Sequence, residues 1–89
     1  MFAANILIID DEPLMRMSIG DALRADGCSV METGLGTEGI NLIKGNGFDI
    51  VITDLRLTDT DGIEVLKAAK RHSPETMVML ITAFGSIDT

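Results

Sequence analysis

The sequence predicts an α/β fold in which helices cover both faces of a doubly wound parallel sheet. Short apolar runs bounded by turn residues alternate along the chain with segments of helical period, which is the pattern of such a sheet. No internal repeat or linker interrupts this alternation, so we expect residues 1–89 to form a single domain. The expected strands are 5–10, 28–32, 48–53 and 77–82, and the expected helices are 13–26, 37–44 and 62–71.

The first half of the chain supplies a central strand, a helix and an edge strand. The strand at 5–10 is almost wholly apolar, which is typical of a strand buried on both faces. Pro13 suits the first position of the helix at 13–26, and Gly27 marks its end. The strand at 28–32 is short and polar enough to lie at an edge. The inward face of the helix is expected to carry Met15, Ile19, Ala22 and Leu23.

The second half repeats the alternation. The helix at 37–44 ends at Gly45, and the strand at 48–53 that follows is apolar enough to be central. The helix at 62–71 precedes a further apolar strand at 77–82. Methionine is flexible enough to fill irregular gaps, so the six methionines are expected to lie in the core. The inward face of the third helix is expected to carry Ile63, Leu66 and Ala69.

Composition and charge exclude several classes of function. A net charge of −7 leaves no basic face for direct contact with nucleic acid. No apolar run approaches the roughly 18 residues of a membrane span, and the apolar N-terminus lacks the basic leader of a secretory signal. Cys28 is the single cysteine, which excludes an internal disulfide. We therefore expect a cytoplasmic protein that attracts cations.

Three aspartates are expected to meet at one end of the sheet. Right-handed crossovers place the strands at 5–10 and 48–53 side by side if the strand order is 2-1-3-4. Asp10, Asp11 and Asp54 then share the switch point where open α/β sheets bind ligands. Converging carboxylates repel one another unless a cation binds or a proton is retained. Oxygen ligands with room for water favour Mg²⁺, or Mn²⁺ in its place.

Four short motifs lie at the ends of the expected strands and at the start of the third helix. They are Ile-Leu-Ile-Ile-Asp10-Asp11-Glu12-Pro13, Ile-Val-Ile-Thr-Asp54-Leu55, Asp61-Gly62 and Ile81-Thr82-Ala83. Together they resemble the receiver domains of bacterial response regulators, in the CheY-like superfamily. The resemblance spans the chain, and the segment from Leu80 onward is most similar to NtrC-type regulators of σ54-dependent transcription. It implies a flavodoxin-like sheet and a signalling phosphoacceptor, which is not an enzyme acting on a separate substrate. Its partners would be a sensor histidine kinase and a transcription output domain on the parent chain.

The resemblance also implies a role for each acidic residue. Asp54 would be the nucleophile that takes the phosphoryl group and forms an aspartyl phosphate. A bound Mg²⁺ would mask the carboxylate charge and neutralise the phosphoryl oxygens. Asp11, Asp54 and the backbone carbonyl of Arg56 would bind the metal directly. Asp10 would act on the metal through water.

The same resemblance implies a role for two further residues, and the chain differs from the family pattern at one position. The Thr82 hydroxyl and the Ala83 amide would contact the phosphoryl oxygens. Receivers usually carry a proline where this chain has Thr58. We therefore expect the loop at 55–61 to be looser than usual and to hold Arg56 less firmly.

A second departure is that the given sequence stops at Thr89, before the family's fifth strand and last helices. The lysine that reaches the phosphoryl group lies on that strand in the family, and neither Lys67 nor Lys70 is placed to substitute. We expect a fragment of a longer regulator that binds Mg²⁺ but accepts phosphate poorly. The alternative is a receiver-like interaction module that is not phosphorylated. The apolar, uncharged strand at 77–82 is expected to mediate self-association.

One other motif competes with this interpretation. Gly34-Leu-Gly36-Thr-Glu-Gly39 fits the glycine pattern of dinucleotide-binding loops, and it follows a strand and begins a helix. The strand before it is short and polar, whereas the dinucleotide fold places this loop after a central strand. That reading also leaves Asp10 and Asp11 without a role. The glycines are more simply interpreted as loop residues before the second helix.

Overall fold

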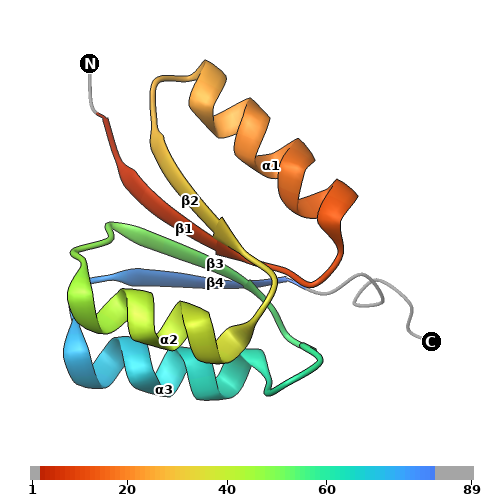
Figure 1. The fold of residues 1–89 in the computed structure, drawn as a ribbon. Helices are drawn as coiled ribbons and strands as arrows, with labels where there is room; N and C mark the ends of the chain where they lie inside the picture. Colours follow the sequence, from red (N-terminus) through yellow and green to blue (C-terminus); the bar gives the residue numbers. More distant parts are fainter. Residues whose placement is uncertain (1–2, 82–89) are drawn as a thin grey trace.

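The structure is a computed structural model that describes residues 3–81. Strands and helices alternate as the sequence predicted (Figure 1). The predicted bounds differ by at most two residues, with the largest difference at the start of the third strand. The elements are β1 (Asn5–Ile9), α1 (Pro13–Ala25), β2 (Ser29–Thr33), α2 (Gly36–Gly45), β3 (Ile50–Asp54), α3 (Gly62–His72) and β4 (Met77–Ile81).

The strands form one parallel sheet in the order β2-β1-β3-β4, which confirms the predicted topology. Helix α1 lies on one face and packs against β1 and β2, whereas α2 and α3 lie together on the other face (Figure 1). Helix α3 covers β3 and β4 on that face. Within residues 3–81 no helix has the length and apolar character needed to cross a membrane.

The core has two layers because β1 and β3 are buried on both faces. On the side of α2 and α3, Leu7 and Ile9 of β1 pack with Val51 and with Val65 of α3. The second layer lies on the side of α1, because alternate side chains of a strand point to opposite faces. It consists of Ile6 and Ile8 of β1, Ile52 of β3 and the preceding Ala4. Burial of each large apolar side chain contributes about 1.5–3 kcal/mol to folding.

The inward faces of two helices differ from the prediction. Ile19 and Leu23 of α1 pack on the core as expected, but Met15 and Ala22 are exposed. Helix α3 presents the small residues Gly62, Ala68 and Ala69 together with Val65, and Ile63 is 40% exposed. A helix face made of small residues lies close to the sheet, and this close approach fixes a rotation that turns Ile63 outward. Leu66 is half-buried.

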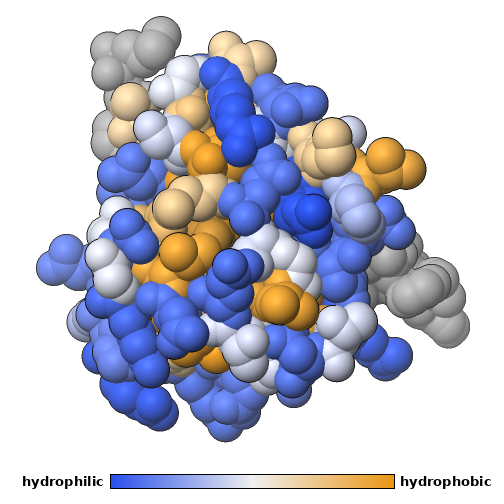
Figure 2. Space-filling model, in the orientation of Figure 1, coloured by the Kyte–Doolittle hydropathy of each residue, from blue (hydrophilic) through white to orange (hydrophobic). Residues whose placement is uncertain are grey.

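The prediction that methionines fill the core was wrong for the five that the structure describes. These side chains are 44–60% exposed, because β-branched residues and leucine of β1 and β3 fill the interior. Three of the five lie on the edge strands β2 and β4, and the other two lie on α1. Hydrophobic surface appears between α1 and α2 (Figure 2). The exposed methionines are Met15, Met17, Met31, Met77 and Met79.

Candidate functional site

The three aspartates meet at the carboxyl ends of β1 and β3, as the strand order predicts. Ile9 of β1 pairs with Thr53 of β3, which brings the residues that follow these strands together. Asp10, Asp11 and Asp54 each offer a carboxylate oxygen, and these oxygens lie within 4.8 Å of one another. We call these three residues the acidic cluster.

The acidic cluster concentrates negative charge at a partly buried position. Asp10 is 2% exposed, whereas Asp11 and Asp54 are partly accessible. Burial raises the pKa of Asp10, and the nearby charges of Asp54, Asp11 and Glu12 raise it further. The Glu12 backbone N–H opposes this by donating to Asp10 Oδ1 at 2.9 Å. A cation bound to these oxygens would remove the repulsion.

The backbone of the β1–α1 loop is held by hydrogen bonds from two directions. The Asp10 N–H donates to the Thr33 carbonyl of β2 at 3.0 Å. Arg16, in the first turns of α1, donates from Nη1 to the Asp10 carbonyl at 2.7 Å. Arg16 Nε also lies 3.5 Å from a carboxylate oxygen of Glu32. Sequence analysis did not identify Arg16, because its partner is a backbone carbonyl that becomes accessible only once the loop has folded.

The β3–α3 loop, residues 55–61, carries Arg56 two positions after Asp54. The Arg56 N–H donates to Asp54 Oδ1 at 3.3 Å, and Gly62 N–H donates to the Leu55 carbonyl at 2.8 Å. Arg56 and Asp61 form an isolated antiparallel bridge across the loop. Although the loop has Thr58 in place of proline, these bonds hold both of its ends.

The two residues expected to contact the phosphoryl group, Thr82 and Ala83, lie outside the described residues. The last described residue, Ile81, pairs with Asp54. Its carbonyl accepts the Leu55 N–H at 2.7 Å. The described end of β4 therefore lies beside the acidic cluster.

The lysines of α3 are engaged away from the acidic cluster. Lys70 donates to the Thr76 carbonyl at 3.0 Å, near the start of β4. Lys67 lies 3.5 Å from a carboxylate oxygen of Glu64 on the same helix. Neither partner belongs to the acidic cluster, and the view that neither lysine serves the site stays a prediction.

Comparison with known proteins identifies the family. The sequence profile described as the response regulator receiver domain matches residues 6–89. This chain belongs to the response regulator receiver domain family. Receiver domains are signalling modules, which agrees with an acidic cluster at the switch point of a parallel sheet.

Individual relatives agree with this assignment. The transcriptional regulatory protein GlrR of Escherichia coli (strain K12) is 33% identical over 84 residues, which are 94% of this chain and 19% of GlrR. A CheY-like receiver from Methanospirillum hungatei JF-1 superposes with a TM-score of 0.89 at 27% identity, covering 97% of this chain and 69% of that one. TrrA from Thermotoga maritima, solved in complex with Mg²⁺ and BeF, superposes with a TM-score of 0.84 at 26% identity. The match covers 90% of this chain and 70% of the TrrA chain. The chain thus spans about a fifth of GlrR.

The glycines of the competing dinucleotide motif have structural roles in this receiver. A Cβ atom on Gly36 would lie 2.2 Å from Thr60 Cγ2, and one on Gly39 would lie 2.3 Å from Ile9 Cδ1. The space beside these two glycines is therefore filled by the protein's own side chains. Gly34 lies against the β1–α1 loop, where its Cβ would be 3.7 Å from the Asp10 carbonyl oxygen. The arrangement argues against a dinucleotide site.

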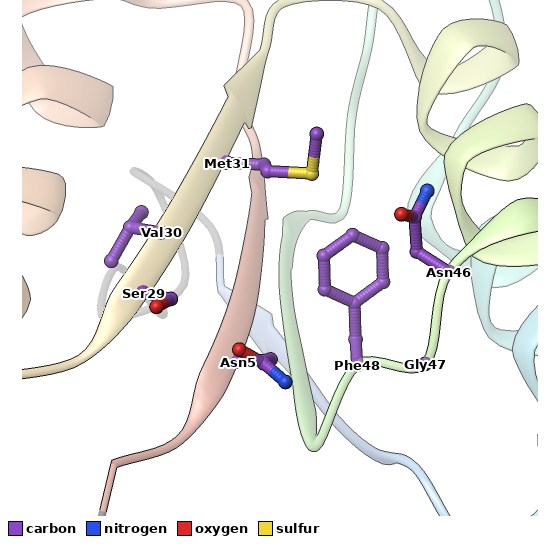
Figure 3. A pocket seen from close by; sticks show the side chains of 7 residues that line it. All are labelled: Asn5, Ser29, Val30, Met31, Asn46, Gly47 and Phe48. Atoms are coloured by element: carbon purple, nitrogen blue, oxygen red, sulfur yellow. The ribbon is translucent and has the colours of Figure 1, made fainter.

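A separate pocket lies at the opposite end of the sheet (Figure 3). Its volume is about 310 Å³, and the Phe48 ring and the Met31 side chain border it. Asn5 and Ser29 mark the amino ends of β1 and β2, so the pocket is separated from the acidic cluster by the length of the strands. It takes no part in the site described above.

Proposed function

We propose that this receiver accepts a phosphoryl group on Asp54 and thereby transmits a signal in a two-component system. The observation that carries the proposal is the acidic cluster, whose carboxylate oxygens lie within 4.8 Å of one another at the carboxyl ends of β1 and β3. The cluster lies where parallel α/β sheets bind ligands. Asp54 is partly exposed, so a phosphodonor can reach its carboxylate.

The acidic cluster fits a hard divalent cation, Mg²⁺ or Mn²⁺. All of its side-chain donors are carboxylate oxygens, which these ions prefer, and burial together with the neighbouring carboxylates raises the pKa of Asp10. We assign Asp11, Asp54 and the Arg56 carbonyl as direct ligands and Asp10 as a ligand through water. When bound, the ion would neutralise charge on the phosphoryl oxygens. The complex of TrrA with Mg²⁺ and BeF supports this assignment by similarity.

The residues of this chain would orient the reacting groups. The Arg56 N–H donates to Asp54 Oδ1, which leaves Oδ2 as the proposed nucleophilic atom. As the bond from Oδ2 to phosphorus forms, the bond from phosphorus to the kinase histidine nitrogen breaks, and that nitrogen keeps the electron pair. The Thr82 hydroxyl and the Ala83 amide are proposed donors to the phosphoryl oxygens.

The partners of the parent protein are inferred from relatives. GlrR is a transcriptional regulatory protein, and the match covers 19% of its length. We infer a sensor histidine kinase as phosphodonor, an output domain that regulates transcription, and a cytoplasmic location. The net charge of −7 supports the view that the receiver itself does not bind nucleic acid. The alternative function is a protein-interaction module that is not phosphorylated.

Intact-mass measurement with acetyl phosphate and Mg²⁺ separates these two functions. We expect slow, Mg²⁺-dependent gain of one phosphoryl group by the wild-type chain, because both lysines of α3 have partners outside the acidic cluster. Asp54→Asn should gain none, and Asp49→Asn, at the opposite end of β3, should behave as wild type. Labelling of Asp54→Asn at the wild-type rate would contradict the assignment. Absence of both phosphoryl transfer and beryllofluoride-induced NMR shifts in wild type would favour the interaction module.

Strand β4 supports a second proposal, self-association of the chain. Within residues 3–81, β4 pairs only with β3, and none of its residues is charged. Met77 is 60% exposed, Met79 is 47% exposed and Leu80 is 40% exposed. Strand β4 therefore exposes apolar side chains on both of its faces. An uncharged apolar edge of this kind readily pairs with another strand. We propose that β4 of a second copy occupies it.

A charged substitution on β4 tests the self-association. Lysine is a common means of blocking edge pairing in natural sheets, so Met79→Lys should raise the dimer dissociation constant by roughly tenfold or more. Met17→Lys on α1 is the matched control, because Met17 is similarly exposed, at 52%, and its replacement adds the same single charge outside β4. Sedimentation velocity over a concentration series measures the dimer dissociation constant of each variant and of the wild type. A wild-type chain that stays monomeric at every concentration would exclude the proposal.

A further inference from the structure

The start of helix α2 obtains its cap from a distant part of the chain. The residue before the helix is Leu35, whose side chain offers no acceptor to the first backbone N–H groups. The carboxylate of Asp59, in the β3–α3 loop, takes this role. Oδ1 accepts the Gly36 N–H at 2.9 Å, and Oδ2 accepts the Thr37 N–H at 2.9 Å and the Thr37 hydroxyl at 2.7 Å.

The charge state of Asp59 suits this role at neutral pH. The Thr37 N–H, the Thr37 hydroxyl and the Gly36 N–H, in that order of effect, lower the pKa of Asp59 to about 2. A carboxylate with this pKa is ionised throughout the physiological range. The hydrogen bonds therefore join a full negative charge to the positive end of the α2 dipole.

Close packing accompanies the hydrogen bonds. A Cβ atom on Gly36 would lie 2.2 Å from Thr60 Cγ2 and 2.9 Å from Leu57 Cδ1, so the loop leaves no room for even a methyl group. Leu57 also packs against the core between the sheet and α2 and α3. The loop and the first turn of α2 thus meet through both polar and apolar contacts.

This contact links the two halves of the acidic cluster. The segment 34–37 lies against the β1–α1 loop at one end, where a Cβ on Gly34 would be 3.8 Å from Asp11 Cα. At its other end it is bonded to Asp59, three residues beyond Arg56. The segment 34–37 therefore connects the β3–α3 loop to the backbone of Asp10 and Asp11.

We propose that Asp59 is a positioning residue for divalent-cation binding. By clamping the β3–α3 loop on the first turn of α2, it fixes the Arg56 carbonyl relative to Asp10 and Asp11 and so sets the affinity of the acidic cluster. The inference rests on the metal binding proposed above. It adds a residue that touches neither the metal nor the phosphoryl group.

The test is the Mg²⁺ affinity of matched variants, measured by calorimetric titration at a temperature where circular dichroism shows each to be folded. Loss of a group that orients metal ligands typically costs 10–100-fold in affinity, and we expect Asp59→Ala to raise the Mg²⁺ dissociation constant about tenfold. Asp49→Ala is the control, because it also removes one exposed carboxylate that accepts a backbone N–H, from Asn5 at 2.8 Å. It should change the dissociation constant by less than about twofold, since it lies far from the cluster.

A second variant keeps the test valid if Asp59→Ala does not fold. Thr37→Ala retains the backbone donor and removes only the hydroxyl, so a smaller increase in the dissociation constant is expected.

Where Asp59→Ala does fold, adding Thr37→Ala to it should not raise the dissociation constant further, because the hydroxyl acts through the Asp59 carboxylate. If these variants keep the wild-type Mg²⁺ affinity and only their unfolding temperature falls, Asp59 is a helix cap and nothing more. That result would overturn the positioning role but leave the proposed metal site intact. Failure of the wild type to bind Mg²⁺ would overturn the proposed metal site as well.

Discussion

Replacement of Gly62 by alanine is expected to destabilise the fold and to displace the backbone of Asp54. A Cβ atom at Gly62 would lie 2.6 Å from the Asp54 carbonyl oxygen and 3.1 Å from Leu55 Cα. Both are backbone atoms, which cannot rotate aside as the end of a side chain can. The first turn of α3 must then move away from β3, and overpacking of this kind costs about 1–3 kcal/mol.

Urea unfolding and Mg²⁺ titration of the same samples measure both effects of Gly62→Ala. The matched control is Gly45→Ala at the end of α2, where a Cβ would meet no atom within 4 Å. Alanine has the higher helix propensity, so the control should leave the free energy of unfolding unchanged or raise it slightly. Equal unfolding free energies for the two variants would refute the prediction. So would a Gly62→Ala chain with wild-type Mg²⁺ affinity.

The strand order and the acidic cluster were predictable because they depend on strong local signals. Strands β1 and β3 are apolar at consecutive positions, and the structure buries Leu7 on one face and Ile8 on the other. Such a strand must be central in a sheet with helices on both faces. Right-handed connections then bring Asp10 and Asp54 to adjacent strand ends, whatever the details of helix packing.

The rotation of each helix was harder to predict than its presence. In α3 the predicted inward face was Ile63, Leu66 and Ala69, and Ala69 is buried as expected, but the buried face centres on Val65 and leaves Ile63 exposed. Hydrophobicity alone favours the larger side chains, but small residues determine which face can come close to the sheet. The close contact of Gly62 with the Asp54 carbonyl decides between the two, and it is visible only in three dimensions.

The role of Asp59 was missed for a related reason. In the sequence it lies among turn residues, and its hydrogen-bond partners are 22 and 23 positions away. The signal that could have found it is indirect. A helix that begins after Leu35 has N–H groups without a local acceptor, so an acceptor from another part of the chain is required.

Replacement of Asp10 by asparagine is expected to stabilise the metal-free chain near pH 7 and to weaken Mg²⁺ binding. Asparagine keeps an oxygen that can accept the Glu12 N–H, and it removes one of the charges that converge within 4.8 Å. Removal of the buried charge, together with relief of that repulsion, should raise the free energy of unfolding by an amount on the order of 1–3 kcal/mol. Loss of the charge should also reduce the attraction of the cluster for a cation.

The pH dependence gives this prediction a definite sign. The pKa of Asp10 is raised in the folded chain, so the native state retains a proton that the unfolded state releases. Wild-type stability from this group is therefore highest below the unfolded value of about 3.9 and is lost as the pH rises through the folded pKa. The advantage of Asp10→Asn should be absent in acid and should appear as the pH approaches neutrality.

Mg²⁺ should reduce or reverse the stability advantage of Asp10→Asn over the wild type. A ligand that binds only the native state stabilises it by about 2.7 kcal/mol at a concentration one hundred times its dissociation constant. The wild type gains more from the same Mg²⁺ concentration because it keeps all three carboxylates. Thermal unfolding in EDTA should therefore favour the variant, and unfolding in Mg²⁺ should narrow or invert the difference. A variant that is less stable than wild type in EDTA would show that charge at Asp10 does not oppose folding, and a variant that is equally favoured with and without Mg²⁺ would show that Asp10 does not contribute to Mg²⁺ binding.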